Sequence, residues 1–419
     1  GAGRPEACYV LERLADQAAN ETGLDRLDVR LRNMITEDQM PYTTAIGPTY
    51  DTGNFPALLR RVSKMARYGE FELRRKATQK SGRLRGIGIA SFVESSGVAP
   101  SRFAGAMGAR VATYEAAHIR VNEDGTVVAM LGTHNHGQGH ATTFAQILSD
   151  RLGIAFSNID ILEGDTAMVP RGTGTFGSRS IAVGGSALHI AADKIIDKGR
   201  DIAAHLLEAA TSDIEFTKGD YRVTGTDRKI SFSDISKAAN APFKLPMEIE
   251  PGLDENAFYD PSNFAFSNGA HIAEVEIDPE TGFIKLQNYC AVDDIGTVIN
   301  PMIVEGQLHG GLAQGIGQAL MENCAYDPET GQLLSGSFLD YALPRADTMP
   351  AIISELDQSH PCTHNPLGAK GIGESGAIGA PTAITSAILN ALAPLGNADI
   401  QMPLTPETIW QAISKIGAV

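Results

Sequence analysis

A repeated order of elements constrains the fold of this 419-residue chain more than any other feature. Residues 117–121 alternate between apolar and polar side chains, turn at 124–125, and return as an apolar run at 127–130. Residues 270–277 follow the same pattern and turn at 278–282. Such runs on either side of a glycine-containing turn are typical of a β-hairpin. The sequence therefore predicts two hairpins, and the turn sequence of the second recurs at 327–331, which predicts a third.

A polar loop and a helix follow each of the first two hairpins. The loop at 137–140 (Gly-Gln-Gly-His) precedes apolar residues at helical spacing up to Leu152. The loop at 306–309 (Gly-Gln-Leu-His) precedes a similar run up to Leu320. This order predicts an α+β fold with two related lobes, each made of β-hairpins plus helices.

The domain boundaries follow from this repeat. Apolar spacing predicts helices at 5–19 and near 56–66, and a basic stretch then continues to about residue 85. We therefore expect a helical lead-in and linker over 1–85, a first lobe over 86–245 and a second lobe over 246–419.

Glycine-rich loops are the second unusual feature. Besides 137–140 and 306–309, such loops occur at 172–186 and 365–380, and each precedes a predicted helix; Pro381 is expected to open the last one. Backbone N–H groups at helix starts bind anions, and glycine lets the backbone approach a ligand closely. Four such loops predict a site for a large anionic cofactor with phosphates and a polar ring system. The alternative is that they are ordinary turns into helices.

Charge and composition exclude several classes of protein. Lys and Arg total 34 against 50 Asp and Glu, a net charge of −16, which disfavours a nucleic-acid partner. The sequence has no apolar run of about 18 residues, so no membrane span is expected. Its four cysteines lie far apart, which fits the cytoplasm and disfavours a disulfide scaffold. The chain opens with Gly1 instead of Met, so we expect a part of the protein upstream.

Three local patterns suggest chemistry. Glu374 stands among glycines near Lys370, where a carboxylate beside a cofactor could act as a general base or could simply cap the next helix. The spacing of His134, His136 and His140 could gather a metal, but polar roles in the loop are favoured. The match to G-x-G-x-x-G at 371–376 lacks a preceding strand, so a dinucleotide site is weakly supported. Neither a G-x-S-x-G elbow nor a P-loop is present.

Several strings occur in an order that is familiar as a set. They are G-A-G-R-P-E-A at 1–7, G-Q-G-H at 137–140, G-T-F-G-S-R-S at 174–180, V-D-D-I-G at 292–296, N-P at 300–301, G-Q-L-H-G-G at 306–311, D-Y-A-L-P-R-A at 340–346 and G-A-K-G-I-G-E-S-G at 368–376. Together they resemble the C-terminal half of the molybdopterin-binding large subunit of the xanthine dehydrogenase, aldehyde oxidase and carbon monoxide dehydrogenase family. The resemblance covers essentially the whole chain and implies the cofactor-binding fold of the aldehyde oxidase type.

The resemblance also implies a role for particular residues. Glu374 matches the general base, and no residue is expected to bind molybdenum directly, since the pterin holds it. The positions that match cofactor contacts are Gln138, Gly139, His140, Thr175, Phe176, Gly177, Ser178, Arg179, Ser180, Asp294, Ile295, Gln307, Lys370, Gly371, Ile372 and Gly373. The positions that match the substrate pocket are Ala2, Phe92, Glu94 and Phe176. Lys370 is expected to balance the charge near Glu374.

Departures from the family pattern bear on the substrate. Gly1-Ala2-Gly3-Arg4 stands where carbon monoxide dehydrogenases carry a C-S-F-R stretch, so their copper-bridging Cys is absent. Xanthine-type members place an aromatic residue near Ala2, so a purine is not favoured either.

The expected function is therefore a molybdenum hydroxylase that oxidises an aldehyde or N-heteroaromatic with oxygen from water. Its cofactor would be molybdenum-molybdopterin, as such or as the cytosine dinucleotide. The implied partners are the upstream half of the molybdopterin subunit, an iron–sulfur subunit with [2Fe-2S] clusters and a flavin subunit with FAD. The alternatives are a non-catalytic assembly lobe of such a complex, and an NAD(P)-dependent dehydrogenase built on 371–376.

Overall fold

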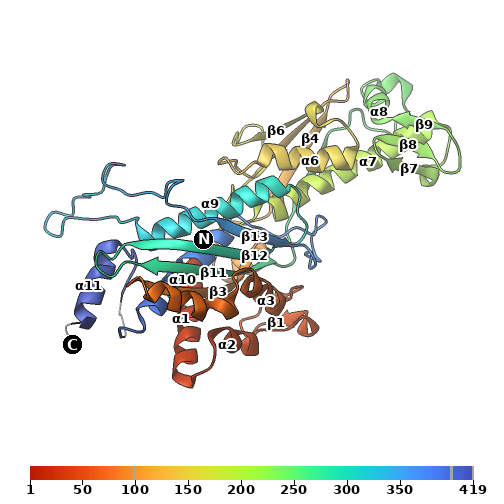
Figure 1. Ribbon diagram of the computed structural model, residues 1–419. Helices are drawn as coiled ribbons and strands as arrows, with labels where there is room; N and C mark the ends of the chain where they lie inside the picture. The colour runs from red at the N-terminus through yellow and green to blue at the C-terminus, as the bar shows by residue number, and fades with distance from the viewer. Residues whose placement is uncertain (99, 397–399, 418–419) are drawn as a thin grey trace.

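The computed structural model describes residues 1–98, 100–396 and 400–417. The chain begins with helices that pack beside one sheet (Figure 1). The elements of this lead-in are α1 (Arg4–Thr22), α2 (Arg26–Asn33), β1 (Tyr42–Thr43), β2 (Thr49–Tyr50), α3 (Phe55–Met65) and α4 (Phe71–Gln79). The helices at 5–19 and 56–66 are confirmed, and α4 occupies part of the stretch that was expected to be a linker.

The first sheet contains the first predicted hairpin. Its strand order is β10-β4-β5-β6, with bounds β4 (Glu115–Val121), β5 (Val127–Leu131), β6 (Ile159–Glu163) and β10 (Glu255–Tyr259). Strands β4 and β5 are antiparallel, and α6 (His140–Leu152) then returns the chain so that β6 runs parallel to β5. Glycines with positive φ, Gly139 and Gly153, stand at the two ends of α6 and delimit it.

The second sheet repeats this arrangement. Its strand order is β13-β12-β11-β3, with bounds β3 (Leu84–Ser96), β11 (Ala265–Ile277), β12 (Ile284–Asp294) and β13 (Ile352–Asp357). Strands β11 and β12 form the second predicted hairpin, α9 (Pro301–Leu320) follows, and β13 runs parallel to β12. The two lobes thus share one topology, which confirms the α+β fold with two related lobes.

The fourth strand of each sheet comes from the part of the chain that was expected to form the other lobe. Strand β3 precedes the first hairpin but pairs with β11 over its whole length. Strand β10 precedes the second hairpin but pairs with β4. The two lobes therefore exchange an edge strand, and the boundaries at residues 85 and 245 stay a prediction.

Two long helices cover the sheets. Helix α7 (Gly185–Leu206) packs on the first sheet, after one turn of π-helix at 180–184, and α10 (Ser375–Leu392) packs on the second. The contact between α10 and β3 is close, because a side-chain carbon at Gly86 or Gly88 would clash with the backbone of α10. Glycine is therefore required at both positions.

A small three-stranded sheet lies at one end of the molecule and α11 (Pro406–Gly417) at the other (Figure 1). The sheet of β7 (Ile214–Thr217), β8 (Asp220–Val223) and β9 (Lys229–Ser231), with α8 (Phe232–Ala239), follows α7. Helices α5 (Ser101–Ala106) and α11 complete the set. Among the described residues, no helix combines the length and apolar character that a membrane crossing would need.

Three expectations about local structure are corrected. The stretch 306–309 is not a loop but lies inside α9, which starts at Pro301 because the Asn300 side chain accepts a hydrogen bond from the amide of Ile303. Pro381 does not open α10 but lies inside it. The turn at 327–331 forms, but it joins a single bridge between Tyr326 and Leu333 and not a full hairpin.

Candidate active site and cofactor cleft

A cleft of about 720 Å³, partly open to solvent, brings together segments from both lobes. It is walled by the start of α6, the loop before α7, the segment from β12 into α9 and the loop before α10. Of the residues predicted to contact a cofactor, those lining it are Gln138, His140, Thr175, Ser178, Arg179, Ser180, Ile295, Gln307, Lys370, Gly371, Ile372 and Gly373. Gly139, Phe176, Gly177 and Asp294 are their neighbours in the chain and do not line the cleft.

The cleft offers unused backbone donors. Within the described part of the chain, the N–H groups of His140, Ile372 and Gly373, which line the cleft, make no hydrogen bond, and neither does that of Gly139, the neighbour of His140. Those of Gly139 and His140 stand at the start of α6, where the helix dipole favours an anion. Gly139 has a φ of 82°, and a side-chain carbon there would lie 2.6 Å from Ile303 Cδ1. These features fit the phosphate and polar ring groups of a molybdopterin cofactor.

Polar side chains shape the walls of the cleft. The Gln138 side chain donates to the carbonyl of His134 at 3.0 Å, which folds its own loop. His140 is buried, and its Nδ1 lies 2.9 Å from Glu163. The Gln307 side chain makes no hydrogen bond within the described residues, and its Oε1 would lie 3.8 Å from a side-chain carbon placed at Gly373. Gln307 is therefore free to bind a ligand.

Glu374 is the residue immediately before α10. It is not among the residues that line the cleft, but Gly373, which precedes it, and Ser178, which bonds to it, do line the cleft. The side chain of Glu374 does not cap the helix, which disfavours the alternative that Glu374 is only a helix cap. Instead, Ser178 Oγ donates to Oε2 at 2.9 Å, and Arg4 Nη1 lies 3.8 Å from Oε1. Ser178 itself has a φ of 50°, an uncommon backbone conformation that is often found at functional sites.

The neighbour of Glu374 is a second carboxyl group, that of Glu94 on β3. Glu94 is fully buried and accepts a hydrogen bond from Ser267 Oγ at 3.3 Å. Burial first, and then the adjacent Glu374, raise the pKa of Glu94 to about 8. Burial opposes ionisation of Glu374 too, but hydrogen bonding with Glu94, the charge of Arg4 and the bond from Ser178 outweigh it and lower the pKa of Glu374. Near neutral pH, Glu94 therefore carries a proton and Glu374 is ionised.

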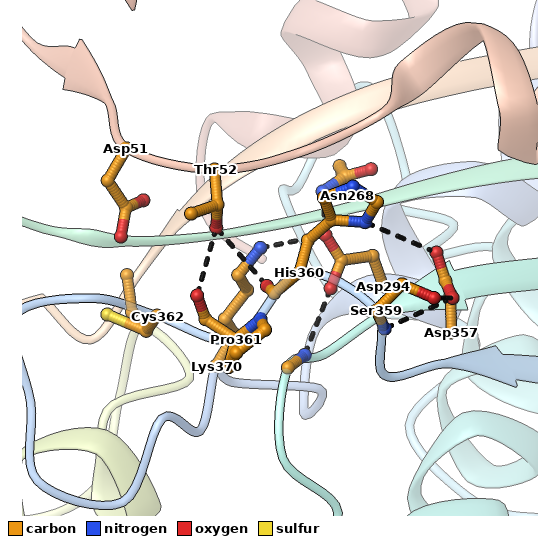
Figure 2. Close-up of polar contacts among 12 residues, drawn as sticks. Asp51, Thr52, Asn268, Asp294, Asp357, Ser359, His360, Pro361, Cys362 and Lys370 are labelled. Atoms are coloured by element: carbon orange, nitrogen blue, oxygen red, sulfur yellow. Dashed lines mark hydrogen bonds and ion pairs between the residues drawn. The ribbon is translucent and has the colours of Figure 1, made fainter. Parts of the chain in front are cut away.

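The two cations expected to contact the cofactor are already paired. Arg179 is fully buried, and its guanidinium donates to Glu115 and to the carbonyl of Thr113, each at 2.5 Å. Lys370 Nζ donates to Asp294 Oδ2 at 2.7 Å, with both side chains inaccessible to solvent (Figure 2). These ion pairs hold the walls of the cleft in place, and the cation near Glu374 is Arg4, not Lys370.

The predicted substrate-pocket residues do not gather at one point. The Phe92 ring packs edge-on against His271 with centroids 5.3 Å apart and lines a second cavity with Gly3 and Arg4. Phe176 is 45% exposed and lies under the guanidinium of Arg179. Ala2 is exposed, and Glu94 lies in the interior beside Glu374.

The other sequence patterns can also be placed. The loop from Pro361 to Lys370 that precedes 371–376 contains no regular strand, so the dinucleotide motif lacks its structural context. Among the described residues, His134, His136 and His140 do not form a metal-binding group. Sequence reasoning missed Arg4, Ser267 and Glu115 because they act through contacts far along the chain, and no local signal marks them.

Comparisons with known proteins agree with this geometry. The profile of the molybdopterin cofactor-binding domain family matches residues 61–350. The large chain of carbon monoxide dehydrogenase from Hydrogenophaga pseudoflava is 38% identical over 98% of this chain and 51% of its own length. The large subunit of nicotine 6-hydroxylase from Paenarthrobacter nicotinovorans is 36% identical over 99% and 51%.

A solved structure shows the same fold. The structure of carbon monoxide dehydrogenase from Oligotropha carboxidovorans superposes with a TM-score of 0.92 at 37% identity, covering 99% of this chain and 52% of that one. This chain spans about half the length of these relatives. On the family profile, the sequence identity and the shared fold, the chain belongs to the molybdopterin cofactor-binding domain family of the molybdenum hydroxylases.

Proposed function

We propose that this chain is the cofactor-binding part of a multi-subunit molybdenum hydroxylase that oxidises an aldehyde or N-heteroaromatic, with water as the oxygen source. Glu374 is its general base. The observation that carries the proposal is the Glu374 carboxylate beside the cleft, which accepts a hydrogen bond from the cleft residue Ser178 and lies near Arg4 and the buried Glu94. The pKa of Glu94 is raised and that of Glu374 is lowered. Two acidic groups with pKa values moved apart are typical of acid–base sites.

The cofactor would be held mainly by neutral groups. The free amides of Gly139, His140, Ile372 and Gly373 and the side chain of Gln307 would bind its phosphate and ring atoms. Arg179, Lys370 and Asp294 would keep the walls in place through their buried ion pairs. When bound, the molybdenum cofactor supplies the electron acceptor for oxidation of the substrate carbon.

The residues around Glu374 prepare it to accept a proton. Ser178 fixes one carboxylate oxygen by a hydrogen bond and Arg4 stabilises the negative charge. Glu94 is neutral near pH 7 and therefore does not repel the charge on Glu374. Glu374 can then take the proton from the oxygen that attacks the substrate.

The first residues of the chain support the substrate class. Gly1-Ala2-Gly3-Arg4 holds no cysteine for a copper site of the carbon monoxide dehydrogenase type and no aromatic ring that would stack on a purine. Nicotine, the substrate in the name of one relative, is an N-heteroaromatic. An open wall near Ala2 suits a substrate of this kind or an aldehyde.

The remaining subunits are also part of the proposal. The exposed apolar side chains of Val10, Leu11 and Leu14 on α1 suit contact with the other half of the molybdopterin subunit. Separate subunits would carry [2Fe-2S] clusters and FAD, and the cofactor would be molybdopterin or its cytosine dinucleotide. Four free cysteines fit a cytoplasmic complex.

A substitution at Glu374 tests this proposal in the complete complex. Glu374→Gln is expected to retain molybdenum and to lower turnover by roughly 10²–10⁴-fold, the range of a general base. Glu329→Gln, at an exposed turn, is the matched control and should retain full turnover. Near-normal turnover of Glu374→Gln would refute the assignment of the base.

A further inference from the structure

A second cluster of chemistry-bearing side chains lies outside the cofactor cleft. Asp51 directly follows β2, and Cys362 and His364 lie between β13 and α10. Among the described residues, this is the only group of three or more metal-ligating side chains whose ligand atoms all lie within 4.8 Å of one another. Figure 2 shows the Asp51 carboxylate directed toward Cys362.

Hydrogen bonds hold the two segments of the cluster together. Thr52 Oγ1 donates to the carbonyls of His360 and Pro361 at 3.2 and 3.1 Å (Figure 2). The amide and hydroxyl of Thr363 donate to Asp51 Oδ2 at 2.9 and 3.1 Å. The three candidate ligands are therefore positioned by the backbone and by Thr52 and Thr363, so little ordering is needed for them to bind an ion.

The ligand atoms lie close enough together for one metal ion to reach all three. His364 Nδ1 lies 3.4 Å from Cys362 Sγ and 3.3 Å from Asp51 Oδ2. Bond lengths of about 2.3 Å to sulfur and 2.0–2.1 Å to nitrogen or oxygen give edges of about 3.3–3.6 Å in a tetrahedral zinc site. The two distances from His364 Nδ1 fall within this range. Because His364 Nε2 also lies 3.5 Å from Cys362 Sγ, the imidazole would turn so that one nitrogen faces the ion.

An unpaired buried atom provides a second, independent observation. The Asp51 side chain is only 10% exposed, and its Oδ1 atom is buried without a hydrogen-bond donor among the described residues. A buried carboxylate oxygen without a partner is costly. A cation bound through Oδ1, while Oδ2 keeps its hydrogen bonds from Thr363, would satisfy it. Cys362 is also buried, at 4% exposed.

We propose that Asp51, Cys362 and His364 bind one zinc ion. A thiolate, an imidazole and a carboxylate form a ligand set that zinc accepts, and three protein ligands leave one position for water. This site is separate from the cofactor cleft, since none of its three residues lines that cleft. The proposal therefore does not depend on the proposed function. The ion ties the chain at residue 51 to the segment that leads into the loop of Lys370 and Glu374.

Cobalt titration of the full 419-residue chain under reducing conditions tests the proposal. Co²⁺ is expected to give thiolate-to-metal absorption and the intense visible bands of tetrahedral cobalt, and one equivalent of Zn²⁺ should abolish both. Cys362→Ser should lose the thiolate absorption and weaken zinc binding by on the order of 100-fold or more. A residue that only orients a metal ligand changes affinity by at most about 100-fold, so a larger loss indicates a ligand. Cys324→Ser, which removes an exposed free thiol, is the control and should behave as wild type.

A second variant allows the proposal to be tested even if Cys362→Ser does not fold. Asp51→Asn retains the shape of the side chain, should fold as judged by circular dichroism, and should also weaken zinc binding. Zinc should raise the melting temperature of the wild-type chain and not that of Asp51→Asn. Absence of thiolate absorption in the wild-type chain, or equal zinc binding by wild type and either variant, would overturn the proposal.

Discussion

Because Glu94 carries a proton in the folded chain, the free energy of unfolding should depend on pH in a way that can be calculated. The pKa of Glu94 rises from an ordinary value of 4.5 to about 8, chiefly because the side chain is buried and then because Glu374 is adjacent. The folded chain therefore binds one more proton than the unfolded chain between these two pH values. This contribution is fully present below pH 4.5 and is lost as the pH rises through 8. At about 1.4 kcal/mol for each pH unit, the total loss is roughly 5 kcal/mol.

The substitution Glu94→Gln isolates this effect. Glutamine keeps the shape of the neutral acid but cannot ionise, so the variant lacks this dependence on pH. The free energy of unfolding of the wild type, relative to Glu94→Gln, should fall by about 1.4 kcal/mol for each unit between pH 5.5 and 7.5. The shift of Glu374 has the opposite sign, so its own contribution titrates below this window.

Urea denaturation at three pH values within that window provides the assay. Glu123→Gln, which changes an exposed glutamate, is the matched control and should follow the wild type at every pH. A constant difference between wild type and Glu94→Gln across the window would show that Glu94 is not a protonated group, and would refute the arrangement of charges at the site.

Three further predictions follow from single contacts. Lys370→Met leaves Asp294 buried without its cation and should lower the free energy of unfolding by about 3–5 kcal/mol. Lys229→Met, at an exposed ion pair, is the control and should lower it by less than about 1 kcal/mol. Equal losses in urea denaturation would contradict this prediction. Gly139→Ala places a carbon against Ile303 at a φ of 82° and should reduce the molybdenum content of the complex, and unchanged content would argue against this wall of the cleft. Ser178→Ala removes a donor that lowers the pKa of Glu374, so the acidic limb of the kcat/KM profile should move to higher pH; an unmoved limb would separate Ser178 from the base.

The local part of the fold was predictable from the sequence. Both hairpins and the helix after 137–140 follow from alternation, turn glycines and apolar spacing within short windows. The exchange of β3 and β10 between the sheets was not predictable, because strand pairs such as Ile89 with Ile272 join distant parts of the chain. The stretch 306–309 was misassigned because Gly306, with Gly310 and Gly311 after it, is typical of a loop, although Asn300 and Pro301 are a helix start signal.

For the candidate site too, local features were predictable from the sequence and contacts between distant segments were not. The position of Glu374 in a glycine-rich loop was evident from the sequence, and the family resemblance gave it a role. Contacts between distant segments place the buried Glu94 beside Glu374. Such contacts also pair Arg179 with Glu115 and Lys370 with Asp294. Burial of a charged side chain leaves no periodic signal in the sequence, so these partners could be found only in the folded chain.

We propose that this chain holds a molybdenum cofactor in the cleft beside Glu374. The most direct test is the molybdenum content, by plasma mass spectrometry, of the complex purified through this chain from its native source. We expect about one molybdenum atom for each copy of the chain, since a single cleft receives the cofactor. An intact, correctly assembled complex that contains no molybdenum would contradict it.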